Sequence, residues 1–213
     1  MTGAKAAMDR VFVARERHTV DTDQAEVLAT LAQQVRELNH AVIHTDLPAA
    51  ELAEVTGLLA GLTDRLNAQA RDRPPVAAVG ANGMIRQLAS PVSGRLNPIA
   101  PPIQITALPG GVTRTVFTLG DLYEGPPTFV HGGVSALVLD ELLGNAAAAN
   151  GTPGMTATLD LRYRRPTPLG VPLTAEARTD RVDGRKTFVN AWIKNPEGQI
   201  TIEASAMFIM PRR

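Results

Sequence analysis

The sequence predicts an α+β fold in which an antiparallel sheet wraps around one long central helix, preceded by an N-terminal helical hairpin. Three observations support this fold class. Short runs with strand composition dominate after residue 111. One stretch among them, residues 131–150, is apolar on nearly every side when read as a helix and must therefore be buried. Two amphipathic helical patterns come before the strands and the apolar stretch in the sequence.

The expected strands cover residues 112–119, 156–164, 173–181, 186–194 and 200–210. Asp-Gly at 183–184 and Glu-Gly at 197–198 separate the last three runs, and such pairs are typical of antiparallel hairpin turns. Across residues 158–163, apolar and polar residues alternate, which indicates a strand with one face in water.

The two N-terminal helices are each marked by an apolar stripe. Apolar residues recur at helical spacing over residues 27–43, after capping candidates at 21–23. Pro48 suits the first turn of a second helix, whose stripe runs over residues 52–66. The stripes could pack on each other as a hairpin or dock on another subunit.

The chain of 213 residues is long enough for one core with an appendage. A segment rich in proline and glycine follows the helices. We therefore expect an N-terminal helical segment at 1–73, a linker and entry to the core at 74–96, and the core domain at 97–213. The linker shows few periodic runs.

Composition excludes several classes of protein. Lys+Arg and Asp+Glu both count 21, so the chain lacks the basic footprint of a nucleic-acid binder. It has no cysteine, which excludes disulfides, thiolate metal sites and a cysteine nucleophile. No apolar run suits a signal peptide or a membrane span. We expect a cytoplasmic protein without a nucleic-acid partner.

Two carboxylates in the apolar helix are the main anomaly. Asp140 and Glu141 are the only charged residues between Glu124 and Asp160. Burying a carboxylate is costly unless it is paired or used. Because adjacent helix residues point about 100° apart, the two cannot share one site. We expect one to mark a functional site and the other to reach solvent or an arginine at a subunit contact.

Gly132 and Gly133 begin the same helix, where backbone N–H groups lack intrahelical partners and the dipole is positive. Such amides could hold a carbonyl oxygen that gains negative charge, although an ordinary flexible turn is the alternative. Gly132 and Asp140 lie about 12 Å apart along the helix axis, too far to act on one carbon. If both act on one substrate, they come from two chains related by a two-fold axis.

These residues form a pattern that resembles the hotdog-fold acyl-CoA thioesterases of the PaaI-like group. The matching segments are 123–133 (YEGPPTFVHGG), 139–144 (LDELLG), 155–156 (MT), 162–170 (RYRRPTPLG) and 185–186 (RK). The resemblance covers roughly residues 97–211. Its most specific part is His-Gly-Gly followed by an aspartate nine residues after the histidine.

The resemblance implies a hotdog fold, a homodimer or dimer of dimers with sites at subunit interfaces, and hydrolysis of an acyl-CoA thioester. No metal or other cofactor is implied, coenzyme A being part of the substrate. Asp140 would be the nucleophile or general base, and the Gly132 amide would polarise the thioester carbonyl. His131 would fix the turn or contact the acyl group, and Thr156 would help to orient the attacking water.

One departure from the family concerns the loop before His131. Some relatives have an asparagine about six residues before the histidine, whereas this chain has Glu-Gly-Pro-Pro at 124–127, which leaves water positioning unassigned. We also assign Gly133 and Glu141 to substrate binding. Four cations that could meet the phosphates of coenzyme A, or simply be solvated, are Arg164, Arg165, Arg185 and Lys186.

Other chemistries fit less well. His40 and His44 could flank a metal, but no H-E-x-x-H pattern and no third ligand are apparent. Ser135 lacks the closing glycine of a nucleophile elbow. A hotdog hydratase is a third hypothesis, but such relatives pair an aspartate with a histidine a few residues later on the helix, and no histidine follows Asp140. A non-catalytic protein that binds acyl-CoA or fatty-acyl groups is the alternative, and release of free CoA would separate the two.

Overall fold

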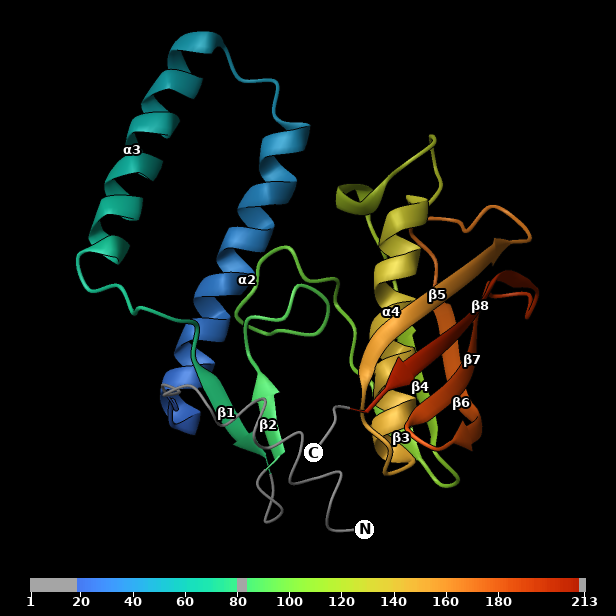
Figure 1. Ribbon diagram of the computed structural model, residues 1–213. Coiled ribbons are helices and arrows are strands. Elements are labelled where there is room, and N and C mark those ends of the chain that lie inside the picture. Colours follow the sequence, from blue (N-terminus) through green and yellow to red (C-terminus); the bar gives the residue numbers. More distant parts are fainter. Residues whose placement is uncertain (1–18, 80–83, 211–213) are drawn as a thin grey trace.

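The computed structural model describes residues 19–79 and 84–210. Its elements, in chain order, are α2 (Thr22–His44), α3 (Ala49–Asn67), β1 (Val76–Val79), β2 (Met84–Gln87), β3 (Thr106–Leu108), β4 (Val112–Phe117), the 3-10 turn η1 (Asp121–Tyr123), α4 (Gly132–Ala149), β5 (Met155–Tyr163), β6 (Leu173–Asp183), β7 (Lys186–Lys194) and β8 (Ile200–Ile209). Figure 1 shows α2 and α3 standing beside a curved sheet that encloses α4.

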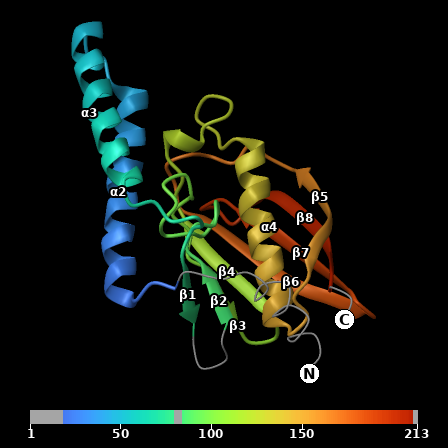
Figure 2. The same cartoon turned by 60° about the vertical axis from the view of Figure 1, so that its left-hand side comes forward.

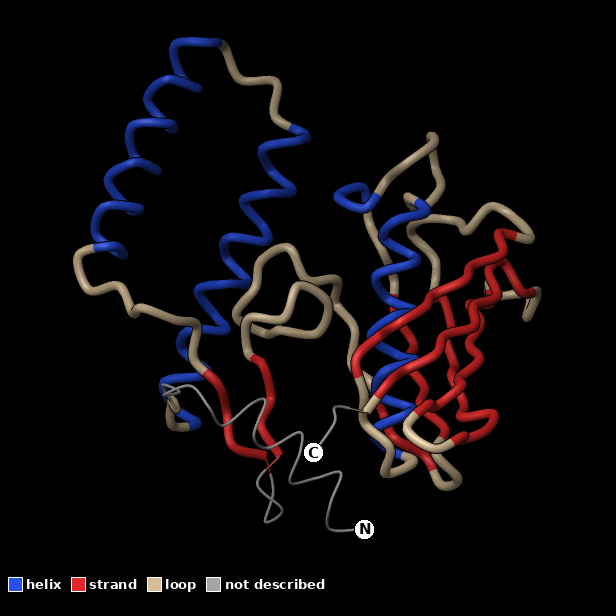
Figure 3. Tube along the Cα trace, in the orientation of Figure 1, coloured by secondary structure: helices blue, strands red, loops and turns tan. Residues whose placement is uncertain are grey.

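The main sheet has six strands in the order β3-β4-β6-β7-β8-β5, and every neighbouring pair is antiparallel. Figures 2 and 3 show α4 lying across its concave face. This confirms the predicted α+β arrangement, the central helix and the five expected strands. The short strand β3, which is exposed at all three positions, was not predicted.

Small side chains let α4 approach the sheet closely. Alanines on the central strands point toward the helix and are almost completely buried: Ala175, Ala177, Ala191, Ala204 and Ala206. From the helix, fully buried Leu139, Leu142 and Leu143 fill the space above them. Burial of these leucines stabilises the fold by about 1.5–3 kcal/mol each. The rigid contact therefore fixes the position of every α4 residue relative to the strands.

A β-bulge in β5 changes which of its residues face α4. Thr156 pairs with Phe208, but the next pair is Thr158 with Met207, so the strand carries one extra residue between them. Cross-strand partners share a face of the sheet. Since Phe208 is buried beneath α4, Thr156 faces the helix as well. Beyond the bulge, Leu159 takes the α4 face and strict alternation resumes.

The N-terminal helix α2 is attached to the core region by polar contacts. Arg95 donates two hydrogen bonds of 2.6 Å to the Glu26 carboxylate, and this bonding lowers the pKa of Glu26. Arg36 donates to the Asn97 carbonyl oxygen at 3.2 Å. Arg95 and Asn97 both lie in the irregular segment 88–104, which also contributes buried Val92 to the core. The segment therefore acts as a bridge between α2 and the sheet domain.

Both predicted N-terminal helices are present, but their apolar stripes do not close a common core. No residue of α3 is buried, and Leu62 and Leu66 are 57% and 56% exposed. Of the two alternatives for these stripes, docking on another subunit stays a prediction. The predicted linker also contains the two-stranded sheet β1-β2, which its irregular composition did not indicate. None of the described helices has both the length and the apolar character needed to cross a bilayer.

The turn at Gly94 has no room for a side chain. A Cβ at this position would lie 2.5 Å from the Ser90 carbonyl oxygen and 2.6 Å from that of Leu88. Gly94→Ala must therefore displace backbone, and we expect it to lower the free energy of unfolding by about 1–3 kcal/mol. The measurement is the midpoint of urea denaturation.

Gly57→Ala is the matched control for that change. Gly57 lies inside α3 with nothing within 4 Å of an added Cβ. The same substitution there should leave stability unchanged or raise it by up to about 1 kcal/mol, because alanine favours helix more than glycine does. An equal loss of stability in both variants would contradict the close packing of the turn at Gly94.

Candidate active site

The turn before α4 is held by His131. Its backbone N–H donates to the Tyr123 carbonyl oxygen at 2.9 Å, which ties the turn to η1. Its ring Nδ1 accepts a hydrogen bond of 3.0 Å from the Gly133 N–H. His131 therefore caps the helix, one of the two roles that the family resemblance implied for it. The Gly133 amide is engaged in this cap.

The Gly132 amide is available to a ligand. Its N–H donates to no acceptor among the residues that the structure describes. Its carbonyl oxygen accepts a hydrogen bond of 2.9 Å from the Tyr163 hydroxyl at the end of β5. A Cβ on Gly132 would lie 3.2 Å from that same hydroxyl oxygen. The phenol thus restrains the carbonyl of Gly132, which belongs to the Gly132–Gly133 peptide, while the Gly132 N–H of the preceding peptide, at the positive end of the helix, has no acceptor among the described residues.

The loop before His131 packs tightly against the turn. A Cβ on Gly125 would lie only 2.7 Å from the His131 Cα, so this position requires glycine. Thr128 adopts a positive φ of 69°, which is uncommon for a β-branched residue. Its N–H donates to Glu124 Oε1 at 2.7 Å. Glu124 lies in the loop in which some relatives have an asparagine before the histidine. Its carboxylate is thus used to hold the loop.

Asp140 lies about two turns beyond Gly132 on α4, too far for both groups of one chain to act on the same carbon. The side chain is half-buried, and Thr156 on β5 donates its hydroxyl hydrogen to Asp140 Oδ1 at 2.9 Å. The bulge in β5 places this threonine on the α4 face. The structure therefore brings together two residues that the sequence analysis selected separately.

Glu141 has a different partner. Its Oε1 accepts a hydrogen bond of 2.5 Å from the Ser93 hydroxyl, in the segment that bridges α2 and the core. Asp140 and Glu141 thus point to different neighbours, as their angular separation on a helix predicts. Within this chain the Glu141 carboxylate fastens the bridging segment to α4.

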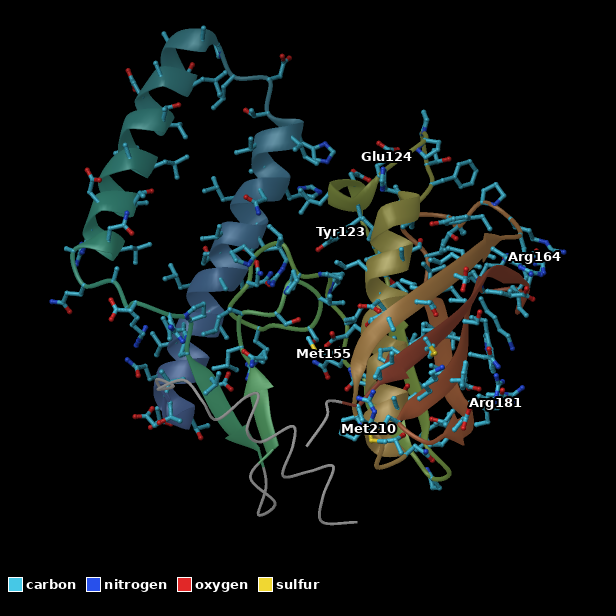
Figure 4. The ribbon with its side chains drawn as sticks, in the orientation of Figure 1. Tyr123, Glu124, Met155, Arg164, Arg181 and Met210 are labelled. Atoms are coloured by element: carbon cyan, nitrogen blue, oxygen red, sulfur yellow. The ribbon has the colours of Figure 1, made fainter. Side chains whose placement is uncertain are left out.

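The four predicted coenzyme A cations do not form one group in a single chain. Arg164 pairs with Glu203 at 2.7 Å and Arg165 donates to the Ile200 carbonyl oxygen. Arg185 donates to the Met210 carbonyl oxygen at the opposite end of the sheet, with Lys186 next to it. Figure 4 shows Arg164 and Met210 at these two ends. Each pair of cations stays a separate candidate for phosphate binding.

The candidate site of one chain is therefore divided into two halves. Tyr163 and Gly132 meet at one end of β5, whereas Thr156 and Asp140 meet near its other end. A cavity of about 410 Å³ lies elsewhere, between α2 and residues 93–104, and none of Gly132, Asp140 and Thr156 lines it. The spacing of about 12 Å along α4 keeps the halves apart.

Sequence reasoning missed three residues that shape these halves. The first two are Tyr163, which orients the Gly132 peptide, and Ser93, which engages Glu141. The third is Glu124, whose side chain holds the loop. Tyr163 had a detectable signal, because the alternation of residues 158–163 put it on the apolar face. The contact between Ser93 and Glu141 spans 48 residues and has no local signal.

Comparison with known proteins places the chain among thioesterases. The model of the Thioesterase superfamily matches residues 128–202, which include α4 and β5 to β7. The chain is 35% identical over 95 residues to acyl-coenzyme A thioesterase THEM4 of Xenopus laevis, covering 44% of this chain and 43% of that protein. It is 36% identical over 98 residues to THEM4 of Mus musculus, covering 46% and 42%. The matches thus span less than half the length of these curated relatives.

A solved structure extends the likeness over nearly the whole chain. The thioesterase superfamily protein RHA08564 is 34% identical in sequence and superposes with a TM-score of 0.78. The superposition covers 91% of this chain and 97% of that one, so it includes more than the sheet and its helix. With this degree of identity and coverage, the chain belongs to the thioesterase superfamily and has its hotdog fold.

Proposed function

We propose that this protein hydrolyses an acyl-CoA thioester to a free acid and CoA. The observation that supports this most is the Asp140 carboxylate, set half-buried in a largely apolar helix and hydrogen-bonded to the Thr156 hydroxyl at 2.9 Å. A carboxylate in such a place is costly to keep without a use. The names of the curated relatives, acyl-coenzyme A thioesterases, supply the reaction class.

Asp140 can act in either of two ways. As a general base it takes a proton from water, whose oxygen attacks the thioester carbonyl carbon. As a nucleophile its oxygen attacks that carbon itself, and water then hydrolyses the resulting anhydride. In both cases the C–S bond breaks, and the CoA thiolate leaves and takes up a proton. Thr156 donates to Oδ1, so Oδ2 is the oxygen we assign to the reaction.

The carbonyl oxygen gains negative charge during either attack. We assign its stabilisation to the Gly132 N–H, which lies at the positive end of α4 and has no acceptor among the described residues. A backbone donor at this point needs no reorganisation, because His131 and Tyr163 already hold the turn. Removing one such donor from an enzyme typically costs about 100- to 1,000-fold in kcat.

Both groups reach one substrate if two chains pair about a two-fold axis. β5 is an edge strand of the sheet, so the backbone N–H and C=O groups along its outer side are not paired with any described strand. Met155, on this strand, is 64% exposed. Antiparallel pairing of two copies along β5 would place Gly132 of one beside Asp140 of the other. We propose a homodimer or a dimer of dimers with two such sites per pair.

The substrate-binding assignments are part of this proposal. The two cation pairs lie at opposite ends of the sheet, so a two-chain site would draw on one pair from each chain to meet the phosphates of coenzyme A. Glu141 acts indirectly, by fastening the bridging segment through Ser93. Gly133 acts by capping, which leaves the neighbouring Gly132 amide to the substrate.

A non-catalytic acyl-CoA-binding protein is the second candidate function. It is favoured by one observation: the loop 124–131 contains no asparagine or glutamine to position water, and its Glu124 carboxylate is engaged by the Thr128 N–H. Incubation with a panel of acyl-CoA esters and detection of the free thiol separates the candidates. Steady release of CoA over many turnovers supports hydrolysis, and binding without release supports the alternative.

Replacement of the carboxylate tests the proposed chemistry. We expect Asp140→Asn to lower kcat by at least about 100-fold, because the substitution removes the nucleophile or general base but keeps the shape of the side chain. Asp160→Asn is the matched control, because it makes the same change at an exposed carboxylate on the other face of β5, and it should stay within a few-fold of wild type. Steady-state kinetics with circular dichroism as a folding check gives the answer. A wild-type kcat in Asp140→Asn would show that Asp140 is neither the nucleophile nor the general base.

The bulge in β5 supplies a second pair of variants. Thr156→Val deletes the hydroxyl that donates to Asp140 and should lower kcat by about 10- to 100-fold, given the strength of a hydrogen bond to a charged group. Thr158→Val makes the same change on the other face of the strand and should leave kcat within about twofold of wild type. Equal effects of the two substitutions on kcat would contradict the proposed positioning role of Thr156.

Subunit complementation tests the two-chain site. Gly132→Pro removes the amide hydrogen and fits the backbone, because His131 has the extended ψ of 133° that a following proline requires. Mixed with Asp140→Ala at random exchange, it should restore roughly a quarter of wild-type activity, since half the dimers are mixed and half their sites are intact.

Gly132→Ala is the control for that experiment, because it adds a Cβ near Tyr163 but keeps the N–H. It should retain far more activity by itself than Gly132→Pro. If verified subunit exchange between the proline and Asp140→Ala chains recovers nothing, the two groups do not meet across chains.

A further inference from the structure

Three side chains with metal-binding chemistry meet where α2 ends beside η1. The donor atoms of His40, His44 and Asp121 all lie within 4.8 Å of one another. His44 Nε2 and Asp121 Oδ2 are 3.0 Å apart, and the two imidazole rings have centroids 4.4 Å apart. Figure 1 shows the C-terminal end of α2 next to the short turn that precedes α4. None of the three belongs to the proposed active site.

Sequence reasoning could not find this arrangement. Histidines four apart on a helix share one face, which supplies two nitrogen donors. A metal site usually needs a third protein ligand, and none was apparent near the pair. The structure supplies a third donor from Asp121, which is far from His44 in the sequence but close in space. The expectation of no metal rested on the lack of this third ligand.

The surroundings of the cluster favour a cation. His40 and His44 lie in the last turns of α2, where the carbonyl groups without intrahelical partners give the helix end a partial negative charge. Arg36, one turn before His40 on α2, is engaged by Gln33 and by the Asn97 carbonyl oxygen. The side chains of His44 and Asp121 are 47% and 53% exposed, so an ion and its water ligands have access.

We propose that His40, His44 and Asp121 form a binding site for one divalent first-row metal ion, with Zn²⁺ the best match. Two imidazole nitrogens and one carboxylate oxygen are donors that Zn²⁺ accepts, with water filling the fourth position. Zn²⁺ ligands at the usual bond lengths lie about 3.3 Å from one another in a tetrahedral site. The pair at 3.0 Å is close to this spacing, and the His40 donor lies within 4.8 Å of both partners.

The ion would fasten the N-terminal helix to the segment that enters α4. Asp121 begins η1, and the carbonyl oxygen of Tyr123 in the same turn accepts the His131 N–H at 2.9 Å. In one chain α2 is otherwise held by exposed or half-buried polar contacts, such as the pair of Glu26 with Arg95. A shared metal would add a link between α2 and η1 whose strength depends on metal supply. The proposal does not depend on thioesterase activity.

Zn²⁺ binding to the full-length, metal-free chain tests the site. Equilibrium dialysis should show about one high-affinity ion per chain, and His40→Ala and Asp121→Asn should each weaken binding at least tenfold. His40→Ala keeps the contact of His44 with Asp121, so its effect reports ligand loss. Asp46→Asn, which removes an exposed carboxylate two residues after His44, is the matched control and should bind as wild type does.

Two further measurements separate this site from incidental surface binding. Zn²⁺ should raise the midpoint of thermal unfolding in wild type and in Asp46→Asn but not in His40→Ala or Asp121→Asn. Excess Mg²⁺ or Ca²⁺ should not displace it, because these ions prefer oxygen ligands. Zn²⁺ affinity unchanged by both substitutions, or no saturable binding in wild type, would overturn the proposal.

Discussion

The packing of α4 on the alanine-lined face of the sheet is the contact on which the rest of the structure depends. Because the alanines of β6, β7 and β8 are small, the helix lies close enough for its leucines to be fully buried. Packing at this density leaves little freedom to slide or rotate. The three groups to which the chemistry is assigned, Gly132, Asp140 and Thr156, are positioned by this one contact, because they lie on the helix or on the strand β5 beside it.

The same contact explains why one helix carries two kinds of chemistry. Its N-terminus offers an unengaged amide at Gly132, where the helix dipole is positive. Its middle offers the Asp140 carboxylate, which β5 reaches through Thr156. Since a helix is rigid, the two groups stay apart in one chain, and a second copy is the simplest way to bring them to one thioester. The exposed edge of β5 is the surface on which that pairing can occur.

The N-terminal part of the chain is connected to this core by polar contacts. The segment 88–104 links α2 to α4, using Arg95 on one side and Ser93 on the other. The second link is the contact of His44 with Asp121, which joins α2 to the turn leading into the oxyanion candidate.

The amino-acid sequence by itself determined the elements with a strong local period. Alternation over residues 158–163, the apolar run of 131–150 and the Gly-containing turns predicted the strands, the central helix and the hairpins, because each depends on neighbours in the chain. It also singled out Gly132 and Gly133 at a helix start and the Asp140–Glu141 pair in an apolar helix, because both are local anomalies. The family likeness added His131 and Thr156.

Only the tertiary structure decided which of these residues meet. Simple alternation would have put Thr156 on the same face as the solvent-exposed residues of β5, and the bulge after it reverses this by inserting one residue. Glu141 with Ser93, and His44 with Asp121, pair across long stretches of sequence that no periodicity connects. Arg164 and Arg165 follow β5, whereas Arg185 and Lys186 lie at the β6–β7 turn, so the long strand β6 carries the chain from one end of the sheet to the other between the two pairs. Local patterns set each face and turn, whereas register shifts and long-range contacts depend on how the whole chain packs.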